Sequence, residues 1–181
     1  DPNTPLADLG LDSLMAMELR HRLKSSLGCS LGSTFLFKYP TVTALLDYLE
    51  QEDLVIPGET TPASSPPTPD RLGDRSTVVP IRPEGSQPPL FLVSGILGSV
   101  FDLYPLGKYL DSDRPIYGLR SLGTDEGEQP LTRMEEIAAY HIQSILEIQP
   151  DGPYYLGGHS FGGKVAFEMA RQLRSRGQEV A

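Results

Sequence analysis

The sequence of 181 residues is long enough for one ordinary domain or two small ones, and its 39% hydrophobic content suffices for a packed core. Its formal net charge is -9, and its basic residues form no stripe along the sequence. We therefore expect no nucleic-acid partner and no contact with an anionic membrane. The single cysteine, Cys29, excludes an internal disulfide framework, and we assign it no role. We find no leader and no apolar run long enough to cross a bilayer, and we expect a cytoplasmic protein without a metal site.

A change of composition after Gln51 divides the chain. The stretch "EDLVIPGETTPASSPPTPDRLGDRS" combines prolines, serines, threonines and acidic residues with almost no apolar periodicity. We interpret residues 51–75 as a linker between two unlike modules, residues 1–50 and 76–181. No internal repeat relates the two modules, so each is interpreted separately.

The first predicted helix covers residues 13 to 27, where "DSLMAMELRHRLKSSLG" combines a capping start, good helix formers and a terminal glycine. Its apolar core stripe comprises Ala16, Leu19, Leu23 and Leu27. Leu14 and Met17 fall on the opposite side of this helix, beside Ser13. They are either a docking patch for a partner or ordinary exposed apolar residues.

Ser13 has two alternative roles at the exposed start of this helix. A serine at a helix start commonly acts as the N-cap, accepting a hydrogen bond from a backbone amide. The same place also favours a phosphodiester, because the first amides are free and the helix dipole is positive there. Spacing alone does not choose between these roles.

A second helix is predicted after "KYPT". Pro40 holds the preceding residue extended, and Thr41 can cap the helix. Its apolar face comprises Val42, Leu45, Leu46 and Leu49. The first module is therefore predicted to be a small all-α helical bundle.

Two stretches of this module, "LGLDSLMAMELRHRL" and "FLFKYPTVTALLDYL", resemble the carrier proteins of modular polyketide synthases. The resemblance covers nearly all of residues 1–50. It implies that a phosphopantetheinyl transferase esterifies Ser13 with 4′-phosphopantetheine. It also implies that the sequence begins inside the domain, after the carrier's first helix.

The second module alternates predicted strands and helices. The runs "PLFLVSG", "PIYGL" and "YYLGGHS" are short, apolar and bounded by Gly or Pro, as buried strands are. Two helices follow from periodic apolar faces: Met134, Ile137, Ala138, Ile142, Ile145 and Leu146 on one, and Val165, Met169 and Leu173 on the other. This alternation predicts an α/β fold with a doubly wound sheet.

The stretch "GGHSFGG" joins the third predicted strand to the following helix and contains the pattern G-x-S-x-G. In this strand, turn and helix context the pattern predicts that Ser160 is a nucleophile. One expected oxyanion donor is the backbone amide of Phe161, directly after the serine. The second candidate is the amide of Ile96 in "FLVSGILGS", for which an ordinary turn is the alternative interpretation.

A serine nucleophile needs a base, and three histidines are available. We expect His21 to be a solvated surface residue, and His141 to be structural, on a helix face adjoining the polar side. His159 precedes the serine, but strand neighbours point to opposite faces, so its ring should be directed away from Ser160. In α/β-hydrolases the acid and the histidine follow the serine, so we expect both beyond Ala181 and the sheet incomplete there.

The stretches "TVVPIRPEGSQPPLFLVSG" and "PDGPYYLGGHSFGGKVAFEMARQLRSRGQEVA" resemble the thioesterase domains that terminate polyketide and nonribosomal peptide synthases. The resemblance covers residues 76–181 and implies an α/β-hydrolase whose Ser160 accepts the acyl chain. We therefore expect the end of a modular synthase, truncated at both ends, with upstream synthase modules as partners and an acyl thioester as substrate. The fragment is expected to be inactive for lack of the triad histidine and aspartate. The alternative is a carrier and interaction module whose hydrolase remnant does no chemistry.

Overall fold

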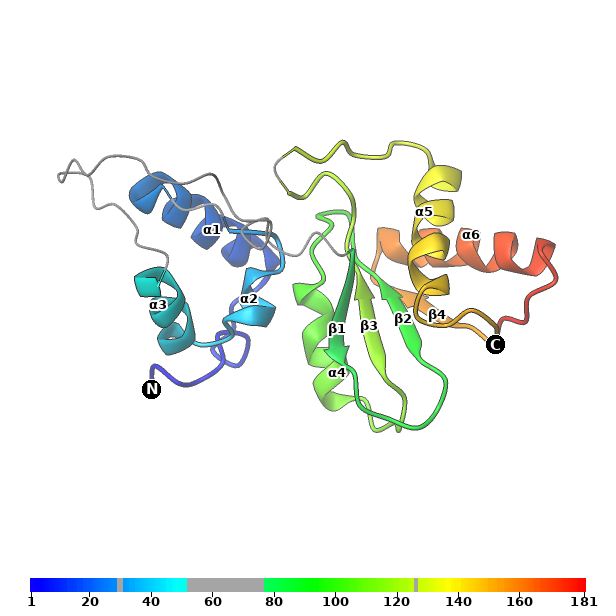
Figure 1. The fold of residues 1–181 in the computed structure, drawn as a ribbon, viewed down its shortest axis with the longest axis horizontal. Coiled ribbons are helices and arrows are strands. Elements are labelled where there is room, and N and C mark those ends of the chain that lie inside the picture. Colours follow the sequence, from blue (N-terminus) through cyan, green and yellow to red (C-terminus); the bar gives the residue numbers. More distant parts are fainter. Residues whose placement is uncertain (29–30, 52–76, 126) are drawn as a thin grey trace. The chain divides into compact units, whose positions relative to one another are not determined.

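A computed structural model of the chain describes residues 1–28, 31–51, 77–125 and 127–181 (Figure 1). The chain divides into two compact units, Asp1–Arg75 and Ser76–Ala181, and each is described here by itself. Cys29 and all of the expected linker except Gln51 lie outside the described residues. No helix in the described ranges is both long and apolar enough to cross a bilayer.

The regular structure of the first unit is helical, with α1 (Ser13–Leu27), α2 (Phe35–Lys38) and α3 (Val42–Gln51). Helix α1 has the predicted bounds, and its predicted stripe is the inward side, with Ala16 buried and the three leucines half-buried. The four residues of α2 were not predicted, because one turn is too short to show a periodicity.

Helix α3 begins as predicted but buries less than predicted. The Thr41 hydroxyl accepts a hydrogen bond from the amide of Ala44 at 3.1 Å, which caps the helix. Leu45 is buried, whereas Val42 and Leu46 are exposed. The predicted four-residue face is therefore wrong at two positions, because the buried arc of α3 is narrower than its apolar arc.

The second unit is built on a four-stranded sheet. Its strands are β1 (Val78–Arg82), β2 (Leu90–Val93), β3 (Ile116–Leu119) and β4 (Tyr155–Gly158), in the order β1-β3-β2-β4. Strands β2, β3 and β4 are the three predicted from the sequence, and β2 pairs in parallel with both others. Strand β1 was not predicted and pairs antiparallel with β3. It contains Pro80, which lacks an amide donor and is tolerated on an edge strand.

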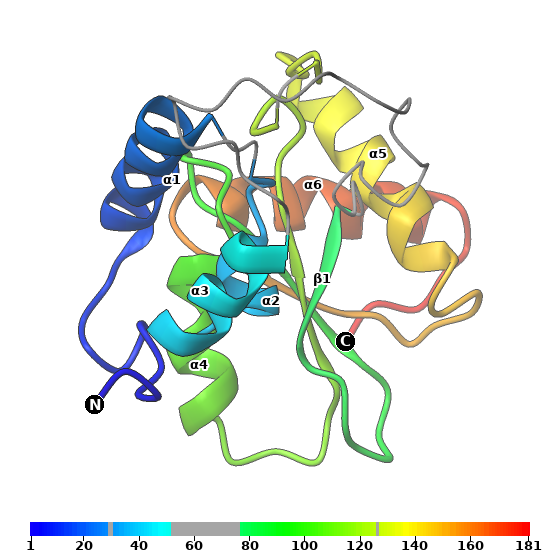
Figure 2. The same ribbon diagram turned by 60° about the vertical axis from the view of Figure 1, so that its left-hand side comes forward.

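Helices cover both faces of this sheet (Figures 1 and 2). They are the one-turn η2 (Phe101–Leu103) and the α-helices α4 (Tyr104–Tyr109), α5 (Met134–Leu146) and α6 (Phe161–Ser175). Phe91 and Val93 of β2 belong to the apolar core formed with α5 and α6. On the other face, Gly118 of β3 and Gly107 of α4 both lie against Ile81. The prediction of an α/β fold is confirmed, and the sheet is mixed because of β1.

The core between the sheet and helices α5 and α6 follows the predicted apolar faces. The buried members on these helices are Ala138, Ile142, Ile145, Val165, Ala166, Met169 and Leu173. Met134, Ile137 and Leu146 are partly buried against the same core. This packing fixes the start of α6 against the end of β4, where the predicted nucleophile lies.

Candidate functional site

The backbone at Ser160 is unusual in the described part of the chain. Ser160 has φ 53° and ψ -116°, and it is the one non-glycine residue with positive φ among the described residues. It joins β4 to α6, and its side chain is exposed. A non-glycine residue held in such a region costs roughly 1–3 kcal/mol, so the surrounding structure must enforce it.

Two glycines enforce this turn, because there is no space for a side chain at either position. A Cβ on Gly158 would collide with the backbone of Gly162. A Cβ on Gly162 would collide with the carbonyl oxygens of Val93 and Ser94, at the carboxyl end of β2. The close approach of three backbone segments therefore explains both glycines of the G-x-S-x-G pattern.

Helix α6 places backbone donors next to the serine. The amides of Gly162 and Gly163 donate to the carbonyls of His159 and Ser160, at 2.8 and 3.1 Å. Phe161 is the first residue of this 15-residue helix, at the positive end of its dipole. Its amide is therefore well situated to stabilise negative charge that develops beside Ser160.

The turn of residues 95–98, which follows β2, lies against the same segment. The amide of Gly98 donates to the carbonyl of Gly95 at 2.9 Å and closes the turn. A Cβ on Gly95 would lie 3.1 Å from Nδ1 of His159. Ile96 is exposed within this turn, with 74% of its surface accessible. The structure thus brings the turn to the residues around Ser160, and the donor role of Ile96 stays a prediction.

His141 is buried, and the predicted placement of its side chain near the polar side of α5 is wrong. Only 1% of its surface is exposed, because it lies three residues after Ala138 and four before Ile145, on the buried face. Burial lowers the pKa of His141 from 6.5 to about 4, so the ring is neutral at physiological pH. Within the described part of the chain, neither ring nitrogen has a hydrogen-bond partner.

The other two histidines are exposed. His21 lies on the surface of α1, as expected. The His159 ring lies beside Gly95, on the β2 side of the turn that joins β4 to α6. Across the described residues, which include all three histidines, no hydrogen bond joins a histidine to Ser160.

The start of α1 corrects two expectations about Ser13. Asp12 is the N-cap, because its carboxylate accepts a hydrogen bond from the amide of Met15 at 2.8 Å. Ser13 is the first residue of the helix, and only 2% of its surface is exposed. The expected exposure is wrong because Ser13 lies one turn before Ala16, within about 60° of the buried stripe.

The apolar residues that follow Ser13 are exposed, as predicted. Leu14 and Met17 have 66% and 41% of their surface accessible, and Met15 between them is also exposed. A partner for this patch is not part of the structure, so its docking role stays a prediction.

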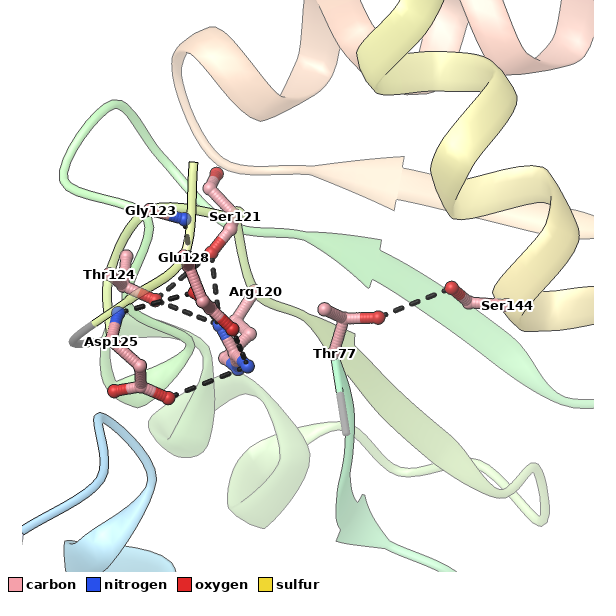
Figure 3. Close-up of polar contacts among 8 residues, drawn as sticks. All are labelled: Thr77, Arg120, Ser121, Gly123, Thr124, Asp125, Glu128 and Ser144. Atoms are coloured by element: carbon pink, nitrogen blue, oxygen red, sulfur yellow. Dashed lines mark hydrogen bonds and ion pairs between the residues drawn. The ribbon is translucent and has the colours of Figure 1, made fainter. Parts of the chain in front are cut away.

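Sequence reasoning missed a buried charged cluster after β3. Arg120 is fully buried and forms an ion pair with Glu128, at 2.6 Å between Nη2 and Oε1 (Figure 3). Burial raises the pKa of Glu128, but hydrogen bonds from Arg120 and from the amides of Asp125 and Gly123 outweigh it, so the pKa lies below its ordinary value. An arginine directly after the apolar run "PIYGL", followed by three acidic residues within eight positions, is the signal that was available.

Comparisons with known proteins agree with this geometry. Residues 88–181 match the family described as Thioesterase domain, and residues 1–49 match Phosphopantetheine attachment site. The non-reducing polyketide synthase PFUR17_0229 of Pseudevernia furfuracea is 35% identical over 99% of this chain and 9% of its own length. A dimodular nonribosomal peptide synthase of Bacillus subtilis is 36% identical over 96% of this chain and 7% of its own length.

Solved structures give the same result. The four-domain nonribosomal peptide synthetase holo-AB3403 matches 99% of this chain and 12% of its own, with TM-score 0.61 and 32% identity. The NocB thioesterase domain, in covalent complex with a fluorophosphonate nocardicin G analog, matches 57% of this chain and 45% of its own, with TM-score 0.51 and 32% identity. The chain spans a small part of the synthases that it resembles. It belongs to the thioesterase domain family, with a phosphopantetheine attachment domain preceding the thioesterase region.

Proposed function

We propose that this chain accepts an acyl group as a thioester on phosphopantetheine attached to Ser13 and passes it to Ser160 for release. The observation that supports this best is the strained, exposed turn at Ser160, which follows a phosphopantetheine attachment domain in the same chain. Because both serines belong to one chain, the transfer is intramolecular. Linking a donor and an acceptor in one chain raises the effective concentration of one at the other, so the transfer does not depend on a tight encounter.

Ser13 fits the attachment of a phosphodiester. It offers a primary hydroxyl at the start of a 15-residue helix, where the dipole favours a negative group. When attached, phosphopantetheine supplies the thiol that forms the acyl thioester. Since Ser13 is buried, attachment requires that the start of α1 opens to the transferase. The exposed side chains of Leu14 and Met17 are the surface that we propose for docking of the transferase and of synthase modules.

The chemistry at Ser160 is an acyl transfer. Its Oγ attacks the thioester carbonyl, a base takes the hydroxyl proton, and the C–O bond forms as the carbonyl oxygen becomes negative. The amides of Phe161 and Ile96 donate to that oxygen. The C–S bond then breaks, and the thiolate takes up the proton. Water or a hydroxyl of the acyl chain attacks the ester in turn and restores Ser160.

We infer that none of the three histidines is the base. His141 is buried, the His159 ring lies beside Gly95, and His21 is exposed on α1. The 181-residue chain alone is therefore expected to turn over thioesters very slowly. This observation also favours a second candidate function, a carrier and interaction module without hydrolysis.

The experiment loads the chain with acyl-coenzyme A and a phosphopantetheinyl transferase, and locates the acyl group by intact mass and peptide mapping. We expect a mass gain on Ser13 that Ser13→Ala abolishes and Ser25→Ala, a change at an exposed serine of the same helix, retains. Hydrolysis is then compared between this chain and one lengthened past Ala181 by the rest of a thioesterase domain. Equal mass gain in Ser13→Ala would refute the carrier role. Equal rates for the two lengths would make His159 or His141 the base.

Docking is tested in the same assay with Leu14→Glu and Met17→Glu. Both changes place a charge on an exposed apolar side chain, so we expect the thermal midpoint to shift little and the loading rate to fall. A large loss of stability with normal loading would show that the two residues serve the fold.

A further inference from the structure

The buried ion pair of Arg120 and Glu128 organises the loop that follows β3. Glu128 accepts hydrogen bonds from both terminal nitrogens of Arg120, at 2.8 and 2.6 Å. The same carboxylate accepts from the amides of Gly123 and Asp125, at 3.0 and 3.2 Å. Four donors from residues 120–125 therefore converge on the carboxylate of Glu128, as Figure 3 shows.

The guanidinium holds the other side of this loop. Nη1 of Arg120 donates to the carbonyl of Ser121 at 3.2 Å and to the hydroxyl of Thr124 at 3.0 Å. Nη2 lies 3.4 Å from a carboxylate oxygen of Asp125. The planar, fixed arrangement of donors on an arginine is suited to setting several acceptors at defined positions at once.

This loop is in direct contact with the turn of residues 95–98. The amide of Ser121 donates to the carbonyl of Gly98 at 3.1 Å. A Cβ on Gly98 would lie 2.6 Å from Cγ2 of Thr124 and 3.0 Å from Cβ of Ser121, so the turn fits tightly against both residues. Gly98 has φ +73°, a conformation that L side chains rarely adopt.

The contacts continue to the nucleophile. Gly98 closes its turn on Gly95, and Gly95 lies against His159, the residue before Ser160. A buried ion pair is weak support for stability, since apolar residues of similar volume often replace one without loss. What it supplies here is a fixed shape for the loop against which the turn rests.

We propose that Arg120 and Glu128 are positioning residues that hold the turn of residues 95–98, with the amide of Ile96, at the geometry required beside Ser160. The catalytic role of that turn rests on the proposed function. The positioning itself is a property of the fold and can be measured without catalysis.

The experiment measures hydrogen exchange by mass spectrometry in peptides covering residues 94–100 and 154–158, in the 181-residue chain. Glu128→Gln keeps the shape of the side chain and removes its charge. The matched control is Arg82→Met, because Arg82 donates to the carbonyls of Gly107, Leu110, Ser112 and Arg114, beyond the opposite end of β3. We expect exchange in residues 94–100 to rise about tenfold in Glu128→Gln, with little change in residues 154–158.

A second variant, Arg120→Met combined with Glu128→Leu, separates positioning from stability. We expect its thermal midpoint to be close to wild type, while residues 94–100 still exchange about tenfold faster. Labelling of Ser160 by a fluorophosphonate, measured in the chain lengthened past Ala181, should slow about tenfold in both variants and stay unchanged in Arg82→Met.

Two results would overturn the proposal: unchanged exchange in residues 94–100, or a uniform rise across the described residues of the second unit. Absence of Ser160 labelling in the lengthened wild-type chain would instead count against the proposed function. The exchange data would then still decide whether the ion pair holds the turn.

Discussion

Ser13 and Ser160 lie at the starts of two helices of equal length, but they differ in backbone conformation, exposure and capping. Ser13 is the first residue of α1, buried, and preceded by Asp12 as the N-cap. Ser160 precedes α6, is exposed, has φ 53°, and makes no side-chain capping bond. The cap of α1 is thus one hydrogen bond from a backbone amide to a neighbouring side chain, whereas the start of α6 is fixed by backbone segments in close contact. The same residue type at a helix start therefore indicates a role only together with its backbone.

The largest effect is expected for Ser160→Ala. In a chain lengthened past Ala181, which we propose supplies the base, thioester hydrolysis should fall by about a thousandfold or more, because the nucleophile is removed. The free energy of unfolding should change by less than about 0.5 kcal/mol, since the hydroxyl caps nothing. Rates and urea unfolding are measured in parallel with Ser175→Ala, a serine at the far end of α6. Retained hydrolysis in Ser160→Ala would transfer the nucleophile to another residue.

The next largest effect is expected on stability, and it should differ in sign between alanine substitutions at the adjacent Gly162 and Gly163. Gly162→Ala should destabilise the second unit by about 3 kcal/mol, because the new methyl group would meet the carbonyls of Val93 and Ser94. Gly163→Ala places its Cβ 3.5 Å from the carbonyl oxygen of Gly158, an ordinary contact, and should stabilise α6 by about 0.5–1 kcal/mol. Chemical denaturation of both variants tests this. Similar effects in the two would show that the tight approach at Gly162 is not what holds Ser160.

The sequence carried enough information to predict the turn at Ser160 and the long helices. Periodic apolar positions predicted α1, α5 and α6, and the G-x-S-x-G pattern placed Ser160 between a strand and a helix. Strand β1 was not predicted because it contains Pro80, which counts against a strand in a local pattern, and because its burial alternates only weakly. The burial of Arg120 depends on its ion pair with Glu128, eight residues later in the chain. A local sequence pattern does not show that the loop folds back to bring these two residues together.

The stability of the unit that contains Ser160 should fall at acid pH because of His141. His141 has a folded-state pKa of about 4 and an ordinary value of 6.5, so the unfolded chain binds more protons between these values. The contribution of the neutral, buried His141 to the free energy of unfolding is complete above pH 6.5. It is lost as the pH falls toward 4, by up to about 1.4 kcal/mol per pH unit. His141→Leu removes the titrating group, so its stability should depend less on pH in this window. Denaturation curves at pH 5 and 7.5 measure the difference, and equal pH dependence in wild type and variant would contradict it.

The smallest effect belongs to the start of α1. Asp12→Ala removes the hydrogen bond to the amide of Met15 and should cost about 1 kcal/mol of helix stability, whereas Asp12→Asn retains an acceptor and should cost less. Hydrogen exchange in the first turn of α1 reports the loss locally. If opening of this turn limits attachment at the buried Ser13, Asp12→Ala should also load phosphopantetheine faster than wild type while Asp12→Asn does not. A slower loading in both variants would mean that the transferase requires the carboxylate itself, and Asp12 would then belong to the surface that the transferase recognises.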